Sequence, residues 1–265
     1  MTIQSIASIL ESWAPLEFAE NYDNVGLITG DRHAAVTGVL ICLDSTEYVV
    51  REALDLGCNM IIAHHPILFK GLKKITGDNY VERTIIQAIR NEIAIYALHT
   101  NLDNIISGVN SKIGQLLGLQ NVQILQPRPG SRHEENITGA GLIGHLPNPI
   151  SGIEFLQRTK EQLQLSFIKH TGIPDQPIST VAVCGGAGSF LIPLALQSGA
   201  NAFLTADLKY HEYFDAEGRL LLLDVGHYES ERFTINLVEE FLKPKVNGTP
   251  IYKTRLSTNP VYYFV

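Results

Sequence analysis

Residues 59–66 read Asn-Met-Ile-Ile-Ala-His-His-Pro, a short apolar run that ends in two adjacent histidines. A run of this length, rich in Ile and bounded by polar residues, is typical of a strand buried on both faces of a parallel sheet. Six more runs of four to eight residues have the same character: Val36–Leu43, Ile93–Leu98, Thr138–Ile143, Thr180–Cys184, Ala202–Thr205 and Leu220–Val225.

Helical periodicity separates several of these strands and covers Ser45–Leu56, Val81–Asn91 and Ser107–Leu117. The first of these segments begins with a Ser-Thr-Glu sequence, which favours a helix N-terminus, and it ends before Gly57. Alternating strands and helices are typical of βαβ units. We therefore expect an α/β fold with mixed, largely parallel sheets flanked by helices.

Two seams interrupt this pattern with proline, glycine and charged residues, over Gln126–Asn136 and Thr171–Ser179. Between them, Thr138–His170 follows the pattern strand, loop, helix, strand. We therefore expect two lobes, the first from residues 1–126 and 220–265 and the second from residues 127–219, inserted in the chain. The tyrosine-rich alternation of Thr249–Val265 predicts a pair of strands.

The composition limits the class of protein. Of 265 residues, 45% are hydrophobic and 18% are charged, which is typical of a globular chain and excludes a disordered or collagen-like one. The net charge of −7 argues against nucleic acid as a partner. The three cysteines lie in apolar runs, and no apolar run nears the roughly 20 residues that span a bilayer. We expect a reduced, cytoplasmic protein without membrane contact.

Histidines and acidic residues follow three of the predicted strands. His64 and His65 come after the first, His99 and Asp103 after the second, and Gly226-His227-Tyr228-Glu229-Ser230-Glu231 after the third. Ligands of open α/β sheets bind at the carboxyl ends of strands, so we expect these side chains to share one crevice. A single histidine at a strand end is more often a hydrogen-bonded structural residue, but three matching strand ends favour a binding site.

Imidazole and carboxylate groups together are typical ligands of divalent transition metals. Side chains of adjacent residues diverge, so His64 and His65 suit two ions about 3.5–4 Å apart better than one ion. His227 and Glu231, four residues apart, would lie on one face of a first helical turn. We predict two divalent ions per chain (Zn, Mn, Fe, Ni or Co), bound with open positions for water by His64, His65, Asp103, His227 and Glu231.

Two further motifs follow predicted strands. The glycine-rich turn with Gly185, Gly186 and Gly188 could contact a phosphate, although close packing of a strand on a helix explains most such turns. The motif Thr205-Ala206-Asp207-Leu208-Lys209-Tyr210-His211 could line the same crevice, or Asp207 could cap a helix. His211 and His99 are candidate catalytic acids or bases, with His99 alternatively a partner of a metal ligand. His33, His133, His145 and His170 are expected to be surface or loop residues.

These motifs occur in one order along nearly the whole chain: Asp23-Asn24-Val25-Gly26-Leu27, His64-His65-Pro66, His99-Thr100-Asn101-Leu102-Asp103, the glycine turn, Thr205–His211 and Gly226–Glu231. In this order they resemble the NIF-three-like family of dinuclear-metal proteins, whose members often carry the name GTP cyclohydrolase 1 type 2 homolog. At 265 residues, the chain resembles the short form of the family, without the extra inserted domain of longer members.

The resemblance implies a two-lobed α/β fold in which the middle of the chain forms the second lobe. It also implies toroidal homohexamers whose metal sites face an internal cavity. Applied position by position, the resemblance implies the same five metal ligands. It also implies that the carboxylate of Glu231 bridges the two ions. We expect the first lobe to carry most of these ligands.

The leading hypothesis for function is a metal-dependent hydrolase, in which a metal-activated water attacks a nucleotide or another phosphate-containing small molecule. A GTP cyclohydrolase-like reaction would open the purine ring, but the sequence holds no independent guanine-recognition motif. The alternative is a non-catalytic, metal-stabilised oligomeric scaffold that binds a small molecule or a protein. A ring that encircles DNA would need basic residues such as Lys70, Lys73 and Lys74 at its opening, and the net charge of −7 argues against it.

Overall fold

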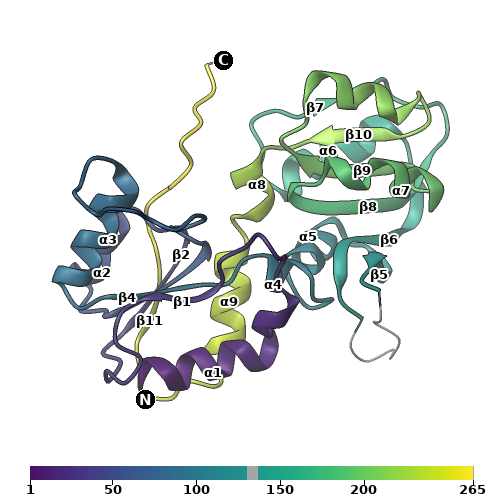
Figure 1. Cartoon of the computed structure of the whole chain (residues 1–265). Coiled ribbons are helices and arrows are strands. Elements are labelled where there is room, and N and C mark those ends of the chain that lie inside the picture. The colour runs from purple at the N-terminus through teal and green to yellow at the C-terminus, as the bar shows by residue number, and fades with distance from the viewer. Residues whose placement is uncertain (130–136, 265) are drawn as a thin grey trace. The chain divides into compact units, whose positions relative to one another are not determined.

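A computed structural model describes residues 1–129 and 137–264 of the chain, which divides into two compact units. Unit 1 consists of Met1–Leu102 and Thr234–Val265, and unit 2 consists of Asp103–Phe233 (Figure 1). The middle of the chain thus forms one unit between the two parts of the other, with boundaries that differ from the expected 127 and 219. Most of the seam Gln126–Asn136 lies outside the described residues, as does His133.

Unit 1 is built on a five-stranded sheet with the strand order β1-β4-β3-β2-β11. Its strands are β1 (Gly26–Thr29), β2 (Val39–Asp44), β3 (Met60–His65), β4 (Ala94–Ala97) and β11 (Ile251–Lys253). β1 is antiparallel to β4, whereas the other neighbours are parallel, as the predicted βαβ pattern requires. The carboxyl ends of β2, β3 and β4 therefore lie at one edge of this sheet.

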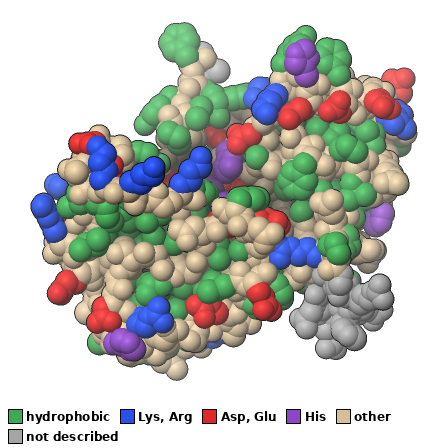
Figure 2. Space-filling model, in the orientation of Figure 1, with side chains coloured by type: hydrophobic (Ala, Val, Ile, Leu, Met, Phe, Trp, Pro, Cys, Tyr) green, Lys and Arg blue, Asp and Glu red, His purple; other side chains and the backbone are tan. Residues whose placement is uncertain are grey.

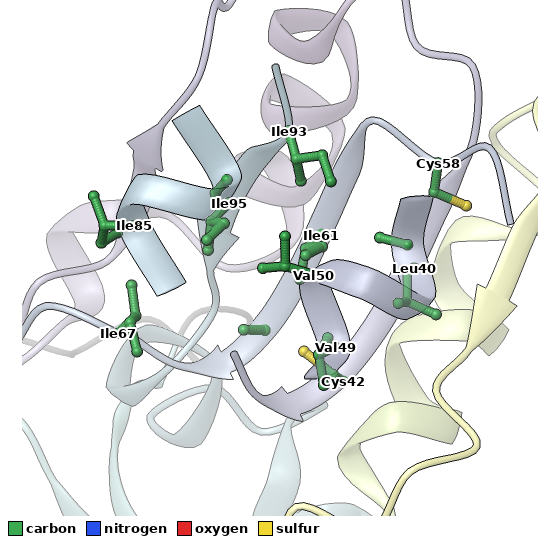
Figure 3. Close-up of a cluster of buried hydrophobic side chains, with 13 residues drawn as sticks. Leu40, Cys42, Val49, Val50, Cys58, Ile61, Ile67, Ile85, Ile93 and Ile95 are labelled. Carbon is green, nitrogen blue, oxygen red and sulfur yellow. The ribbon is translucent and has the colours of Figure 1, made fainter. Parts of the chain in front are cut away.

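Helices cover both faces of this sheet: α1 (Ile3–Trp13), α2 (Glu47–Asp55), α3 (Tyr80–Arg90) and α9 (Thr234–Leu242), with the 3-10 turn η1 (Leu16–Phe18) after α1. On one face, Leu40, Ile61 and Ile95 pack in a buried cluster with residues of α2 and α3 (Figure 3). Side chains alternate along a strand, so the next residue, Tyr96, points to the opposite face. There its hydroxyl donates to Glu11 Oε1 of α1 at 3.3 Å.

Unit 2 contains a six-stranded sheet with the order β5-β6-β8-β9-β10-β7. Its strands are β5 (Gln120–Pro127), β6 (Gly139–Ile150), β7 (Lys169–His170), β8 (Ile178–Ala187), β9 (Ala202–Ala206) and β10 (Leu221–Asp224). The three strands β8, β9 and β10 are parallel, and antiparallel pairings add β5, β6 and β7. Both sheets are mixed, as predicted, and the carboxyl ends of β8, β9 and β10 share one edge.

The expectation that Leu220–Val225 belongs to the first lobe is wrong. This run contains β10, which pairs with β9 so that Leu221 lies opposite Ala202 in the sheet of unit 2. Apolar periodicity identifies a buried strand, but the partner of the strand depends on backbone hydrogen bonds with a segment distant in sequence.

The helical elements of unit 2 are α5 (Val109–Leu117), α6 (Gly152–Gln162), η2 (Ser189–Leu191), α7 (Ile192–Gln197), η3 (Tyr210–Ala216) and α8 (His227–Glu231). The short helix α4 (Thr100–Asp103) spans the chain boundary between the units. In unit 2, Ala182, Phe203 and Leu222 from three strands pack in a buried cluster with Ala195 of α7 and Ala216 of η3. Among the described residues, no helix is long and apolar enough to cross a membrane.

The C-terminal segment forms one strand, β11, and the expected second strand is absent from the described residues up to 264. Beyond β11, two groups of this segment donate to acidic side chains of unit 1. The Arg255 amide donates to Glu52 Oε1 of α2 at 2.9 Å, and the Thr258 hydroxyl donates to Asp44 Oδ2.

Candidate metal centre

The topology of unit 1 gathers histidines and carboxylates at one edge of its sheet. His64 and His65 end β3, and Asp44 ends β2 directly opposite His65 in the strand register. His99 follows β4, which is parallel to both. Asp23 precedes β1, and because β1 is antiparallel to β4, the start of β1 lies at the same edge. Parallel pairing thus brings together residues that are far apart in the sequence.

Three histidines of unit 1 form a group that could hold a metal ion. His64, His65 and His99 each offer one ring nitrogen, and these nitrogens lie within 4.8 Å of one another. The ring centroid of His99 lies 5.4 Å from the centroids of both other rings. The structure therefore places His99, predicted as an acid, a base or a supporting residue, beside the two predicted ligands.

The hydrogen bonds of these rings determine which nitrogen faces a ligand. His64 Nδ1 lies 2.7 Å from the Leu98 carbonyl oxygen, which can only accept, so Nδ1 carries the proton. His65 Nδ1 lies 2.7 Å from Asp44 Oδ1, and His99 Nδ1 lies 2.9 Å from Asp23 Oδ1. A proton on Nδ1 leaves the lone pair on Nε2, the arrangement that metal-binding histidines adopt in proteins.

Each supporting carboxylate is itself held by further donors. The Thr100 amide donates to Asp23 Oδ2 at 3.0 Å, and the Thr258 hydroxyl donates to Asp44 Oδ2. Burial acts to raise the pKa of Asp23, but the hydrogen bond and charge of His99 outweigh it and lower this pKa to about 2. Burial likewise opposes the interaction of Asp44 with His65, and the net effect is a lowered pKa of Asp44. Both groups are therefore anionic at neutral pH.

In unit 2, α8 presents a histidine and a carboxylate on one face. His227 Nε2 lies 3.1 Å from Glu231 Oε2, which agrees with the prediction from their four-residue spacing. His227 Nδ1 lies 2.7 Å from Asp207 Oδ2. Glu231 is only 3% exposed, so its carboxylate is a buried charge that requires a compensating partner. The imidazole of His227 is supported by an oxygen acceptor in the same manner as those of unit 1.

Asp207 does not cap the helical element that follows it. The following element, η3, has Lys209 at its N-cap position, and the Asp207 backbone has φ +56°. Aspartate tolerates this left-handed conformation better than most residues. Its carboxylate instead contacts His227, which pairwise sequence spacing could not reveal because 20 residues separate the two.

The glycine-rich turn at the end of β8 adjoins the same pair. A Cβ at Gly186 would lie 2.5 Å from Glu231 Oε1 and 3.2 Å from His227 Cε1, so only glycine leaves room for these side chains. The Gly185 amide donates to Asn110 Oδ1 at 2.9 Å, and the Gly186 amide donates to Ser230 Oγ at 3.0 Å. Both amides are thus engaged within the protein, which leaves neither to donate to a phosphate.

Asp103 lies in the same part of unit 2. Its carbonyl accepts from Asn110 Nδ2 at 3.1 Å, and Asn110 in turn binds the Gly185 amide. Burial raises the pKa of the Cys184 thiol, and the negative charges of Asp103 and Glu231 raise it further. Asn110 thus joins the Asp103 backbone to the glycine turn beside Glu231 and His227, which places three of the predicted ligands in one region of unit 2.

His211 lies in a different environment. It is exposed on η3, where its ring centroid lies 5.2 Å from that of Tyr210 and 6.4 Å from that of Phe214. Two residues that support the histidines are not predicted as site residues by the sequence pattern: Asp23, which belongs only to a family motif, and Asp44. The position of Asp44 at the end of a predicted strand, beside the strand that ends in His65, was the available indication.

Each α/β unit thus contains imidazoles held in one orientation and nearby carboxylates. Together these groups are typical ligands of divalent transition metals. The sequence matches the Duf34/NIF3 (NGG1p interacting factor 3) family over residues 1–260, and the chain belongs to this family. The predicted family resemblance is thereby confirmed.

Two relatives match over nearly their full length. A Clostridium acetobutylicum protein named GTP cyclohydrolase 1 type 2 homolog is 32% identical and covers 98% of each chain. A Lactococcus lactis protein of the same name is 34% identical and covers 99% of each chain. The crystal structure of a Bacillus cereus protein related to NIF3 superposes with a TM-score of 0.90 at 26% identity, covering 100% of this chain and 99% of that one.

Proposed function

We propose that the chain binds two divalent metal ions through His64, His65, Asp103, His227 and Glu231 and acts as a metal-dependent hydrolase on a nucleotide or another phosphate-containing small molecule. The observation that carries this proposal is the shared orientation of the imidazoles. In each unit, the Nδ1 atom of each candidate histidine ligand lies 2.7 Å from an oxygen atom, so that Nε2 is the ligand atom.

The chemistry of the donor set supports the choice of metal class. Imidazole nitrogens with carboxylate oxygens suit Zn, Mn, Fe, Ni or Co, whereas Ca and Mg favour oxygen ligands alone. Two buried cysteines of unit 1, Cys42 and Cys58, lie in its hydrophobic cluster and do not compete as ligands. When bound, divalent ions supply Lewis-acid polarisation of a substrate oxygen and acidification of water.

Side chains of the protein would orient the metal ligands and transfer protons. Asp44 and Asp207 hold the rings of His65 and His227 and increase their basicity. The His99–Asp23 pair has the arrangement of a general base with its orienting carboxylate, because Nδ1 is bound to Asp23 and Nε2 can accept a proton from water or substrate. We assign the acid–base role to His99, since His211 lies among the aromatic side chains of η3.

The substrate class and the assembly rest on likeness to relatives. The name GTP cyclohydrolase 1 type 2 homolog, which several relatives carry, supports a nucleotide among the substrates to be tested. We infer from the family resemblance that the chain assembles into a homohexamer, for which the mass in solution is the direct test.

A metal-stabilised scaffold without turnover is the second candidate. The engagement of the Gly185 and Gly186 amides within the protein favours it, because a turn that binds phosphate needs donors directed at the ligand. A screen of nucleotides and phosphoesters with the metal-loaded protein separates the two candidates. Product formation supports the hydrolase, and binding without product supports the scaffold.

The first experiment measures metal content per chain by elemental analysis, after purification without chelator or affinity-tag metal. Wild-type protein should hold about two ions per chain, and His65→Ala and Glu231→Ala should each lose most of this content. His145→Ala is the matched control, since this histidine is exposed and its Nδ1 lies 3.2 Å from the Thr180 hydroxyl. Wild-type content below about 0.2 ions per chain after incubation with Zn, Mn and Fe would refute the metal site.

A further inference from the structure

We propose that unit 2 carries a second binding site, a pocket beside η3 that takes an uncharged planar heterocycle of the nucleoside class. The pocket has a volume of about 490 Å³, within the range of small-molecule sites. It lies between η3, the end of β7 and the turn before β10, and its lining residues are His170, Thr171, Gly172, Tyr210, Tyr213, Phe214, Ala216, Glu217 and Gly218. None of these is a predicted metal ligand.

The aromatic residues of η3 form the main wall of this pocket. In a 3-10 helix, residues three apart lie above one another, so Tyr210, Tyr213 and Ala216 share one face. The Tyr210 and Phe214 rings meet edge to face, with centroids 5.6 Å apart and an interplanar angle of 74°. Their faces offer a surface on which a flat ring can stack.

These two rings are largely exposed to solvent. Tyr210 is 73% exposed and Phe214 is 66% exposed, although burial of an aromatic side chain is favourable. Near the position of β7 in Figure 1, Figure 2 shows hydrophobic side chains beside a histidine, with charged side chains next to them. An exposed aromatic cluster beside a cavity indicates a surface that is covered when its ligand binds.

One aromatic side chain of the pocket is held firmly in place. The Tyr213 hydroxyl donates to Asp224 Oδ2 at 3.3 Å, and Asp224 is 2% exposed. Burial raises the pKa of Tyr213, and the neighbouring Asp224 carboxylate raises it further, so the hydroxyl remains a protonated donor to Asp224. The same carboxylate accepts from the Leu208 amide at 3.3 Å, which links the pocket wall to the end of β9. A rigid wall lowers the entropic cost of binding.

The charges around the pocket select among planar ligands. Glu217 is the acidic residue of the lining, and no Lys or Arg is among the described residues that line it. A phosphate would therefore find no lysine or arginine in the described lining of the pocket. The charge of Glu217 is paired, because its Oε2 lies 2.5 Å from Arg219 Nη2, and this pair offers both an acceptor and donors to the edge of a heterocycle. A nucleoside fits this chemistry better than a nucleotide.

The test uses the full-length protein and saturation-transfer NMR with adenosine, guanosine and cytidine, each beside its 5′-monophosphate. We expect nucleosides to bind and the monophosphates to bind several-fold more weakly. Tyr210→Ala and Phe214→Ala should each weaken binding about 5- to 150-fold, the usual effect of removing one stacking ring. Tyr262→Ala is the matched control, because this tyrosine is 91% exposed and belongs to unit 1.

The outcomes of this test distinguish failure of the pocket proposal from failure of the metal-site proposal. His64→Ala should retain nucleoside binding, so the pocket can be confirmed even if the metal proposal fails. Absence of binding by any of the three nucleosides at about 5 mM overturns the proposal, as does an equal loss in Tyr262→Ala. If nucleosides do not bind but Tyr210→Ala and Phe214→Ala lower the mass measured by light scattering, the rings contact a second copy of the chain and the proposal is wrong.

Discussion

The approach of Gly186 to the His227–Glu231 pair allows a quantitative prediction for Gly186→Ala. The Gly186 backbone has φ +62°, and the added Cβ would lie 2.5 Å from Glu231 Oε1, which is buried. The left-handed conformation costs alanine about 1–2 kcal/mol, and displacement of buried neighbours costs about 1–3 kcal/mol more. We therefore expect the free energy of unfolding to fall by about 2–5 kcal/mol.

Gly199→Ala is the matched control for this change. Gly199 also belongs to unit 2 and has φ +75°, but a Cβ there would have no atom of the described residues within 4 Å. Its substitution should therefore cost only the conformational part, about 1–2 kcal/mol. The difference between the two variants isolates the contact of residue 186 with Glu231 and His227.

Two measurements test this reasoning: urea unfolding followed by circular dichroism, and Zn affinity from competition with a chromophoric chelator. Gly186→Ala should lower Zn affinity at least about tenfold, because it moves two candidate ligands. Gly199→Ala should leave Zn affinity unchanged. If the two variants lose the same stability and bind Zn equally well, Gly186 does not shape the site and the reasoning is refuted.

Three further predictions concern the supporting carboxylates and one buried glutamate. Asp44→Asn should weaken metal binding about tenfold, because it reduces the basicity of His65; unchanged chelator competition would contradict this. Asp207→Asn keeps a residue that tolerates φ +56°, so we expect a similar loss at His227 with an unfolding midpoint close to wild type. Glu82 Oε2 accepts hydrogen bonds from the backbone amides of residues 76, 77 and 78. These bonds, led by those from residues 76 and 78, lower the pKa of Glu82 from 4.5 to about 2. Its ionised form thus stabilises unit 1 above pH 4.5, and this contribution is lost as pH falls towards 2; Glu82→Gln should flatten the acid limb of a stability–pH curve.

Much of the local structure could be predicted from residue patterns. The run that ends in His64 and His65 forms β3, and the predicted helix over Ser45–Leu56 contains α2 with Thr46 as its cap. His227 and Glu231 share a helix face because the 3.6-residue period places residues four apart together. These features depend on interactions among residues that are close in sequence, so the local residue pattern is enough to predict them.

Other features depend on partners that lie far apart in the chain. The pairing of Asp44 with His65 follows from the parallel register of β2 and β3, and that of Asp207 with His227 follows from the neighbouring ends of β9 and β10. The assignment of β10 to unit 2 and the single C-terminal strand arise in the same way. In each case a hydrogen bond joins segments whose proximity the local pattern does not encode.

The sequence alone therefore determined which residues form buried strands and helices. It also determined the order of the motifs and the family, because these features depend on local periodicity and residue type. Only the tertiary structure decided which sheet each strand joins and which nitrogen of His65 and His227 faces a ligand. It alone also decided that aromatic residues of η3 line a pocket. The physical reason is that strand pairing and side-chain hydrogen bonds are short-range in space but long-range in sequence.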